Sequence, residues 1–254
     1  MTSWKADTKG PWVVTKGERV VLYTRPTGYS TVDSPDAVTI QSIILEQEQA
    51  IDFVNKALNT NFHSKVKIYL YNKDEAREKI GTDGGGFASL NKFKKHIYFT
   101  FHPQPYFNTV MDKFDNVGVH EMVHIITISK LGRIRTGFFG EGYANAIDGN
   151  YGVEYTDGIP TRKRNDAALI KIREAGGLLS PSDLLYNDFI PESAYYPQIG
   201  CLIKWMFEEY GVNNINKLFG LKRDRIEQEF KRITGVDFRD MEAKYMTYVG
   251  LHVD

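Results

Sequence analysis

Apolar and polar residues alternate with two different periods along the first third of the chain. Short runs rich in β-branched and aromatic residues at 19–23 and 65–71 predict two strands. Between them, apolar residues recur at three- and four-residue steps across 34–59, which predicts a long amphipathic helix. This apolar stripe consists of Ile40, Ile43, Ile44, Ala50, Ile51, Val54 and Leu58. A second, short helix is predicted to follow Asp74, so this part mixes strand and helix.

The pattern changes after two further strand-like runs, at 84–90 and 96–101, which flank a polar turn and predict a hairpin. From Asp112 onward the pattern is almost wholly helical, with the strongest helices predicted at 195–210, 224–234 and 237–249. Ser180 before Pro181 predicts a helix start, because serine is a good N-cap and proline suits the first helical position. Residues 162–164, Arg-Lys-Arg, are interpreted as a solvated loop or a helix start.

Neither a repeat nor a linker-like segment divides the chain. We therefore expect a single α+β domain over residues 1–254, with a mixed sheet-helix lobe over about 1–111 and a helical lobe over about 112–254. With 254 residues, 42% of them hydrophobic, the chain is long enough to bury a substantial core.

Charge and cysteine content narrow the classes of function. Lysine plus arginine equals aspartate plus glutamate, at 32 each, so no basic surplus is present to neutralise a phosphate backbone. We therefore expect no nucleic-acid partner. The single cysteine, Cys201, excludes an intramolecular disulfide and a cysteine-based zinc finger, and its apolar neighbours predict a buried small side chain rather than a nucleophile.

The sequence contains no segment suited to crossing a membrane. All runs of consecutive apolar residues are far shorter than the roughly 18 needed, and the polar start lacks the apolar core of a signal peptide. We expect a soluble chain, for which an extracytoplasmic location is favoured only if a signal segment was removed. No partner protein is evident from the sequence.

The motif that carries chemistry is His120-Glu121-Met122-Val123-His124, an H-E-x-x-H pattern. On a helix this spacing places two imidazoles one turn apart on one face with a carboxylate beside them. Apolar residues surround the motif, as expected of a helix buried inside a protein. Burying these three polar groups without a partner costs several kcal/mol in desolvation, which a metal ion offsets. Two core histidines without a metal remain the alternative.

A catalytic zinc centre needs a third protein ligand and leaves one position for water. Glu141, 17 residues after His124, is the candidate, because residues 138–146 predict the start of another helix and two glycines between the helices allow the chain to turn back. A carboxylate that only favours the helix dipole is the alternative interpretation. With Glu141 as ligand, we expect one Zn²⁺ per chain, and Glu121 would accept a proton from water and pass it to the leaving amine.

These two segments, 120–124 and 139–144, resemble the gluzincins, the peptidase MA-like group that includes thermolysin and the zinc aminopeptidases. The likeness extends more weakly over about 60–250. It implies a thermolysin-like zincin catalytic domain, with the zinc site at the junction of the two lobes. It also implies an oxyanion-stabilising tyrosine, for which Tyr196 aligns best and Tyr195 is the reserve. Packing residues at a helix start are the alternative for both.

The same resemblance suggests residues around the metal. Gly86, Phe87 and Ala88 are similar to the family's glycine-containing edge strand, which would pair with a peptide; a flexible glycine turn is the alternative. The carboxylate that orients a zinc-bound imidazole in thermolysin-like relatives falls here on Asn145, which is uncharged, and Asp148 is a possible substitute.

The resemblance therefore predicts a zinc-dependent peptidase acting on peptide or protein substrates. Two alternatives stay open at this point. One is a zinc amide or ester hydrolase for a small or cell-wall substrate, because the same zinc chemistry serves many amides. The other is a catalytically decayed, zinc-stabilised binding module, against which the intact Glu121 argues, since a structural site has no need of a base.

Overall fold

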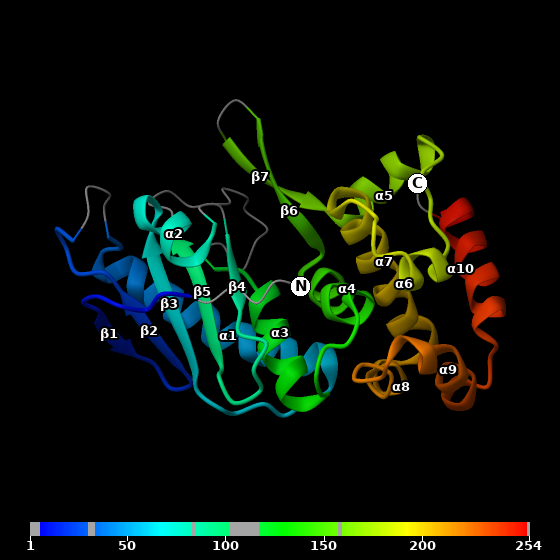
Figure 1. Ribbon diagram of the computed structural model, residues 1–254, viewed down its shortest axis with the longest axis horizontal. Helices are drawn as coiled ribbons and strands as arrows, with labels where there is room; N and C mark the ends of the chain where they lie inside the picture. Colours follow the sequence, from blue (N-terminus) through cyan, green and yellow to red (C-terminus); the bar gives the residue numbers. More distant parts are fainter. Residues whose placement is uncertain (1–5, 30–33, 83–84, 102–116, 157–158, 253–254) are drawn as a thin grey trace. The chain divides into compact units, whose positions relative to one another are not determined.

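The computed structural model describes residues 6–29, 34–82, 85–101, 117–156 and 159–252 (Figure 1). Helices and a mixed sheet are both present, so the α+β class is confirmed. The chain divides into two compact units, each described here by itself. The first comprises Met1–Lys56, Asn61–Lys130 and Ile159–Thr161; the second comprises Ala57–Thr60, Leu131–Gly158 and Arg162–Asp254.

The first unit is built on a five-stranded sheet. In spatial order its strands are β1 (Val13–Lys16), β2 (Val20–Thr24), β3 (Val66–Asn72), β5 (His96–Phe101) and β4 (Gly86–Ala88). β2, β3 and β5 run parallel, whereas β1 and β4 are antiparallel to their neighbours and form the two edges. The predicted hairpin is therefore confirmed as the pair β4–β5; its predicted first residue, Gly84, lies outside the described residues.

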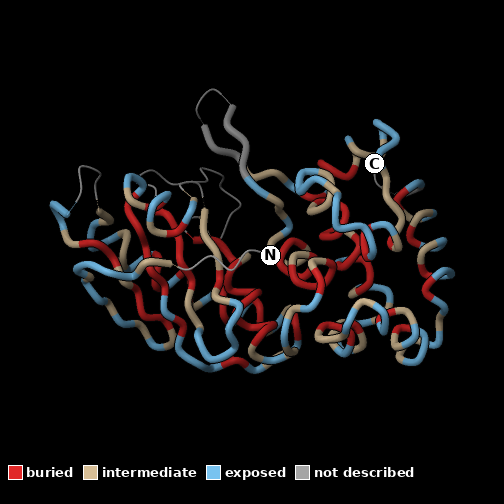
Figure 2. Tube along the Cα trace, in the orientation of Figure 1, coloured by how far each residue is buried: buried red, intermediate tan, exposed pale blue. Residues whose placement is uncertain are grey.

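Two helices cover this sheet, because successive residues of a strand point to opposite faces. Tyr69, Tyr71 and Tyr98 on one face form a core cluster with two residues of α2 (Lys73–Ile80). The intervening residues of β3 are buried on the other face, where α1 (Ala37–Leu58) lies (Figure 1). The predicted apolar stripe of α1 is confirmed, since most of its members are buried (Figure 2).

α3 (His120–Lys130) completes the first unit and packs beside β4 and β5. Of the ten residues after His120, seven are apolar or are the small residues serine and threonine, and residues 121–128 are all buried. The helix can therefore pack on all sides. Gly118, with a φ of +76°, turns the chain into this helix in a conformation that favours glycine. α3 is therefore a central helix, which fixes the positions of its side chains.

The second unit is mainly helical. Its helices are α4 (Gly137–Asp148), α5 (Asn165–Glu174), α6 (Pro181–Tyr186), α7 (Glu192–Tyr210), α8 (Val212–Asn216), η1 (Arg223–Arg225), α9 (Ile226–Thr234) and α10 (Phe238–His252). The three helices predicted at 195–210, 224–234 and 237–249 are confirmed as α7, η1 with α9, and α10. The predicted start at Ser180 is also confirmed, because its hydroxyl accepts a hydrogen bond from Asp183 N.

α4 and α7 approach each other closely at two glycines. A Cβ added to Gly142 of α4 would lie 2.7 Å from Cγ1 of Ile203 in α7. A Cβ added to Gly200 of α7 would lie 2.9 Å from Cβ of Asn145 in α4. Neither position has space for a larger side chain, so these glycines set the distance between the two helices.

The prediction of an almost wholly helical second half was wrong at 150–164. There β6 (Asn150–Thr156) and β7 (Ile159–Arg164) form a two-stranded sheet; the Arg-Lys-Arg run ends β7, and its last residue, Arg164, is also the N-cap of α5. Tyr151, Val153 and Tyr155 occupy every second position, a period of two that indicates a strand. The predicted beginning of the helical half, Asp112, lies outside the described residues.

Two further expectations concern Cys201 and membranes. Cys201 lies half-buried on α7, and burial raises the pKa of its thiol to about 12, which suits a packing residue better than a nucleophile. Within the described ranges, each helix is too short or too polar to cross a bilayer.

Candidate metal centre

α3 presents its two histidines on one face. His120 is the first residue of the helix and His124 follows one turn later, so their ring centroids lie 5.0 Å apart. The hydrogen bond from Val123 N to Val119 O, 3.0 Å long, closes the first turn of backbone around the motif. His124 is buried and His120 half-buried, so the pair spans the boundary between core and solvent.

Glu141 is carried by α4, whose start is well defined. Thr136 caps this helix by accepting a hydrogen bond from Phe139 N, and Gly140 lies so close to Ile134 that a Cβ would be 2.7 Å from its Cγ2. These contacts fix the first turn of α4, from which the half-buried Glu141 projects.

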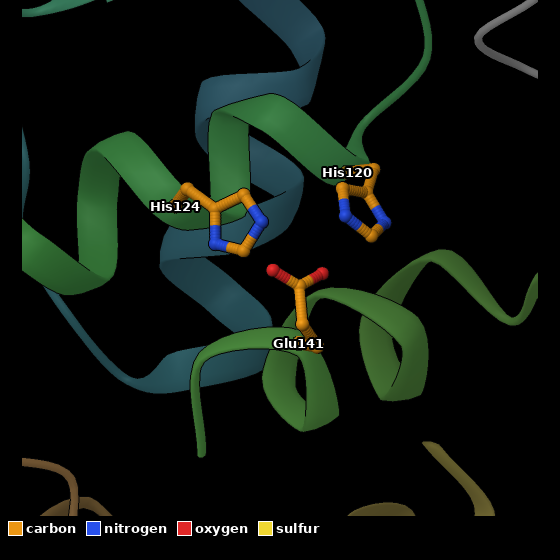
Figure 3. Close-up of side chains that lie close together, drawn as sticks. All are labelled: His120, His124 and Glu141. Carbon is orange, nitrogen blue, oxygen red and sulfur yellow. The ribbon is translucent and has the colours of Figure 1, made fainter. Parts of the chain in front are cut away.

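The three predicted ligands come together. One ligand atom from each of His120, His124 and Glu141 lies within 4.8 Å of the other two (Figure 3). Donors bound tetrahedrally at about 2.0–2.1 Å lie about 3.4 Å from one another, so small side-chain rotations would bring this set around one ion. Two imidazole nitrogens and one carboxylate oxygen are also a donor set that suits zinc and leaves a coordination position open.

Glu121 lies beside this set without belonging to it. It follows His120 on α3, is 9% exposed, and is not one of the three side chains whose ligand atoms gather. Because successive residues on a helix are rotated by about 100°, its carboxylate projects beside the imidazole face and not along it. Its role in proton transfer stays a prediction.

Tyr195 and Tyr196 stand at the start of α7. Burial raises the pKa of both phenols above the usual range, and the charge of Glu141 raises both further. The Tyr195 hydroxyl lies 3.6 Å from where a Cβ of Gly137 would be, at the start of α4. The pKa of Tyr196 is also raised by Glu192, through its charge and a hydrogen bond. Both phenols remain protonated donors at neutral pH.

The two residues predicted to support the ligands differ in their surroundings. Asp148 forms an ion pair with Arg162 at 3.0 Å, with both side chains about a tenth exposed, so its carboxylate is already engaged. Asn145 is fully buried, and among the described residues neither atom of its side-chain amide has a hydrogen-bond partner. An unsatisfied buried amide is costly, so Asn145 keeps hydrogen-bonding capacity that Asp148 spends on its ion pair.

One supporting contact was not predicted from the sequence. Glu46 of α1 accepts hydrogen bonds from Val117 N at 3.1 Å and Gly118 N at 3.3 Å, while Gln47 donates to Gly118 O at 2.8 Å. Both side chains are buried, and together they hold the backbone that leads into His120. The available signal was the position of these two polar residues inside the apolar stripe of α1.

β4, which contains the predicted substrate-binding residues, is an edge strand next to α3. Hydrogen bonds from Thr100 N to Gly85 O and from Ser89 N to His96 O show which residues face β5. By the alternation of an antiparallel pair, the backbone groups of Gly86 and Ala88 point toward the other side. No described strand pairs with β4 on that side.

Gly86 has a packing reason to be glycine. A Cβ at this position would lie 2.3 Å from Tyr98 O, too close for any side chain. Phe87 rests against the Tyr98 ring with centroids 5.1 Å apart, and Ala88 is buried. The glycine therefore belongs to an ordered strand and not to a flexible turn, the alternative that the sequence left open.

The structure thus gathers His120, His124 and Glu141, and the charge of Glu141 acts on both candidate tyrosines. The chemical roles of these residues remain predictions. No protein-family model matches the chain, and no curated protein matches it either.

Proposed function

We propose that this protein is a zinc-dependent peptidase of the gluzincin kind, in which His120, His124 and Glu141 hold one zinc ion. The observation that carries the proposal is that ligand atoms of these three residues lie within 4.8 Å of one another. The two histidines lie on α3, which also bears Glu121, and Glu141 lies on α4. A purely structural zinc site is usually closed by four protein ligands, whereas three ligands with a neighbouring carboxylate suit hydrolysis.

The residues of this chain divide the reaction between them. When bound, zinc supplies a Lewis acid that polarises the carbonyl and makes water more acidic. Glu121 accepts the proton of the attacking water and returns it to the leaving amine. Tyr196 donates a hydrogen bond to the oxygen on which negative charge develops. No covalent bond between the chain and its substrate is needed.

The edge strand favours a peptide over a small amide or ester as substrate. Gly86 and Ala88 present backbone N–H and C=O groups on the open side of β4, and β4 lies beside α3. An extended peptide can pair with such an edge through main-chain hydrogen bonds, which give affinity with little dependence on sequence. A small ester would leave these groups without a role.

The test combines metal analysis with one substitution. The purified protein should contain about one zinc per chain, and Glu121→Gln should keep that zinc while hydrolysis falls by at least about a hundredfold. Glu78→Gln, on an exposed side chain of α2, serves as the matched control and should change neither quantity. A panel of protein, dipeptide and aminoacyl substrates identifies the bond cleaved. Near-normal activity of Glu121→Gln on any cleaved substrate would refute the proposal.

A further inference from the structure

The second unit contains a pocket that shares no residue with the candidate metal centre. It has a volume of about 450 Å³ and is lined by side chains of α5, α7 and α10 together with Arg164. This volume falls in the range of about 300–1,000 Å³ that is typical of small-molecule sites, and it is too small to seat a folded partner. The pocket therefore suggests a small ligand.

Aromatic rings form one wall of this pocket. Trp205 and Tyr245 are buried, with ring centroids 5.2 Å apart, and the Tyr248 ring lies 6.1 Å from Trp205. Leu169, Ile170 and Val249 add aliphatic surface. Such a lining favours an aromatic or branched aliphatic side chain of a ligand.

The Tyr245 hydroxyl gives this wall a polar point. Tyr245 is 2% exposed, and its hydroxyl has no hydrogen-bond partner among the described residues. The side chains that influence this hydroxyl most, Cys201 and Tyr248, also line the pocket. A buried hydroxyl without a partner costs free energy, and because its oxygen is closed off from solvent it adds polarity behind the aromatic wall and not a contact on the pocket surface.

Two exposed side chains of opposite charge line the pocket. Lys204 and Glu208 lie one turn apart on α7, and neither forms an ion pair with a described residue. Lys204 lies near Asp166, which Arg164 already binds at 3.0 Å, so that end carries a net positive charge. Four residues of helix separate the Cα atoms of Lys204 and Glu208 by about 6 Å along the axis.

We propose that this pocket binds a zwitterion the size of a dipeptide. Its carboxylate would face Lys204, its ammonium group would face Glu208, and an apolar side chain would rest on Trp205 and its aromatic neighbours. Two extended residues span about 7 Å, close to the rise of about 6 Å between these two positions of α7. The proposal requires no metal and is independent of whether the chain hydrolyses peptides.

The probe is the dipeptide leucyl-phenylalanine, compared with its N-acetyl and C-amide forms, with binding measured by calorimetry on the intact metal-loaded protein. Lys204→Met should weaken binding of the free dipeptide by at least about threefold, yet leave binding of the C-amide form unchanged. Glu208→Gln should likewise weaken binding of the free dipeptide, yet leave binding of the N-acetyl form unchanged. Lys217→Met, an exposed lysine of the same unit outside the pocket, is the matched control.

A second measurement separates this pocket from the metal centre. Binding should persist after the metal is chelated, and it should change the fluorescence of Trp205 in a Trp4→Phe/Trp12→Phe background, which leaves that indole as the sole tryptophan. Absence of binding at millimolar dipeptide, or equal affinity of the parent, Lys204→Met and Glu208→Gln for all three probes, would overturn the proposal. Binding that disappears with the metal would assign the dipeptide to the metal centre instead.

Discussion

Glu141 is the proposed ligand that the sequence specifies least, and its removal is the most informative test of the proposed site. Glu141→Ala leaves both histidines and their helix in place, so zinc binding should weaken by about tenfold or more without being abolished, and excess zinc should restore part of the activity. Dialysis against graded zinc concentrations measures the effect.

Glu174→Ala, an exposed acidic residue of α5, controls for loss of negative charge and should bind zinc like the parent. If Glu141→Ala also bound zinc as tightly as the parent, the third ligand would have to be another residue. Asp148 would then require the ion pair with Arg162 to open before it could coordinate the metal.

The two tyrosines at the start of α7 allow a matched comparison. Tyr196→Phe removes one hydrogen bond made chiefly in the transition state, so kcat should fall by about a hundredfold while KM and zinc content change little. Tyr195→Phe removes the corresponding hydroxyl, which lies beside Gly137, and should lower kcat less. Reversal of this order in steady-state kinetics would transfer the role to Tyr195.

At the scale of elements, α1 supports the start of α3 through Glu46. Glu46→Ala would leave Val117 N and Gly118 N without their buried acceptor, which should cost about 2–6 kcal/mol of stability at roughly 1–3 kcal/mol for each group. Because these amides lead into His120, zinc affinity should also fall. Urea unfolding and zinc titration measure the two effects.

Glu46→Gln retains an acceptor oxygen and should recover most of both losses. A stability loss with unchanged zinc affinity would show that the contact only supports the fold and does not position the ligand. Glu46→Gln also separates an effect of charge from one of hydrogen bonding, because its amide is neutral but still accepts a hydrogen bond.

The close contact between α4 and α7 predicts a compensating pair of substitutions. Gly142→Ala places a methyl group 2.7 Å from Ile203 Cγ1 and should destabilise the protein by about 1–3 kcal/mol through overpacking. Ile203→Ala should be destabilising alone but should make Gly142→Ala less harmful, because it vacates the contested space. Thermal unfolding of the four variants in the cycle gives the coupling, and strictly additive losses would contradict this account.

Local sequence patterns predict the features that depend on residues close together in the sequence. The stripe of α1, the cap at Ser180 and the imidazole pair of α3 all depend on residues at most a few positions apart, and each is found where the sequence indicates it. The pair β6–β7 was not predicted, although Tyr151, Val153 and Tyr155 alternate with the period of a strand. This short alternation lies within a half of the chain whose other segments have helical periods.

The parts of the candidate site that the sequence does not reveal depend on contacts between distant residues. Glu46 and Gly118 are separated by 72 positions, and no local pattern links a polar residue of one helix to the amides that precede another. The unsatisfied amide of Asn145 becomes visible only when every neighbour is in place. By contrast, the proximity of Glu141 to the histidines followed from motif spacing together with the family resemblance.

At the scale of the whole molecule, removal of the metal should lower thermal stability. A ligand that binds only the folded state stabilises it by about 4 kcal/mol when present at 1,000 times its Kd. For a chain of 254 residues this corresponds to roughly 10 °C in Tm. Calorimetry with and without chelator should show this difference for the parent and none for His124→Ala; an equal shift in both would mean that the chelated metal is bound elsewhere.

The open side of β4 has a consequence for how copies of this protein behave in solution. An unpaired strand edge is also a template for self-association, since a neighbouring chain can supply the missing hydrogen bonds. β4 limits that hazard by its length, because three residues expose the backbone groups of only Gly86 and Ala88. An edge this short can hold an extended segment that has other contacts, but offers a second sheet too few bonds to start aggregation.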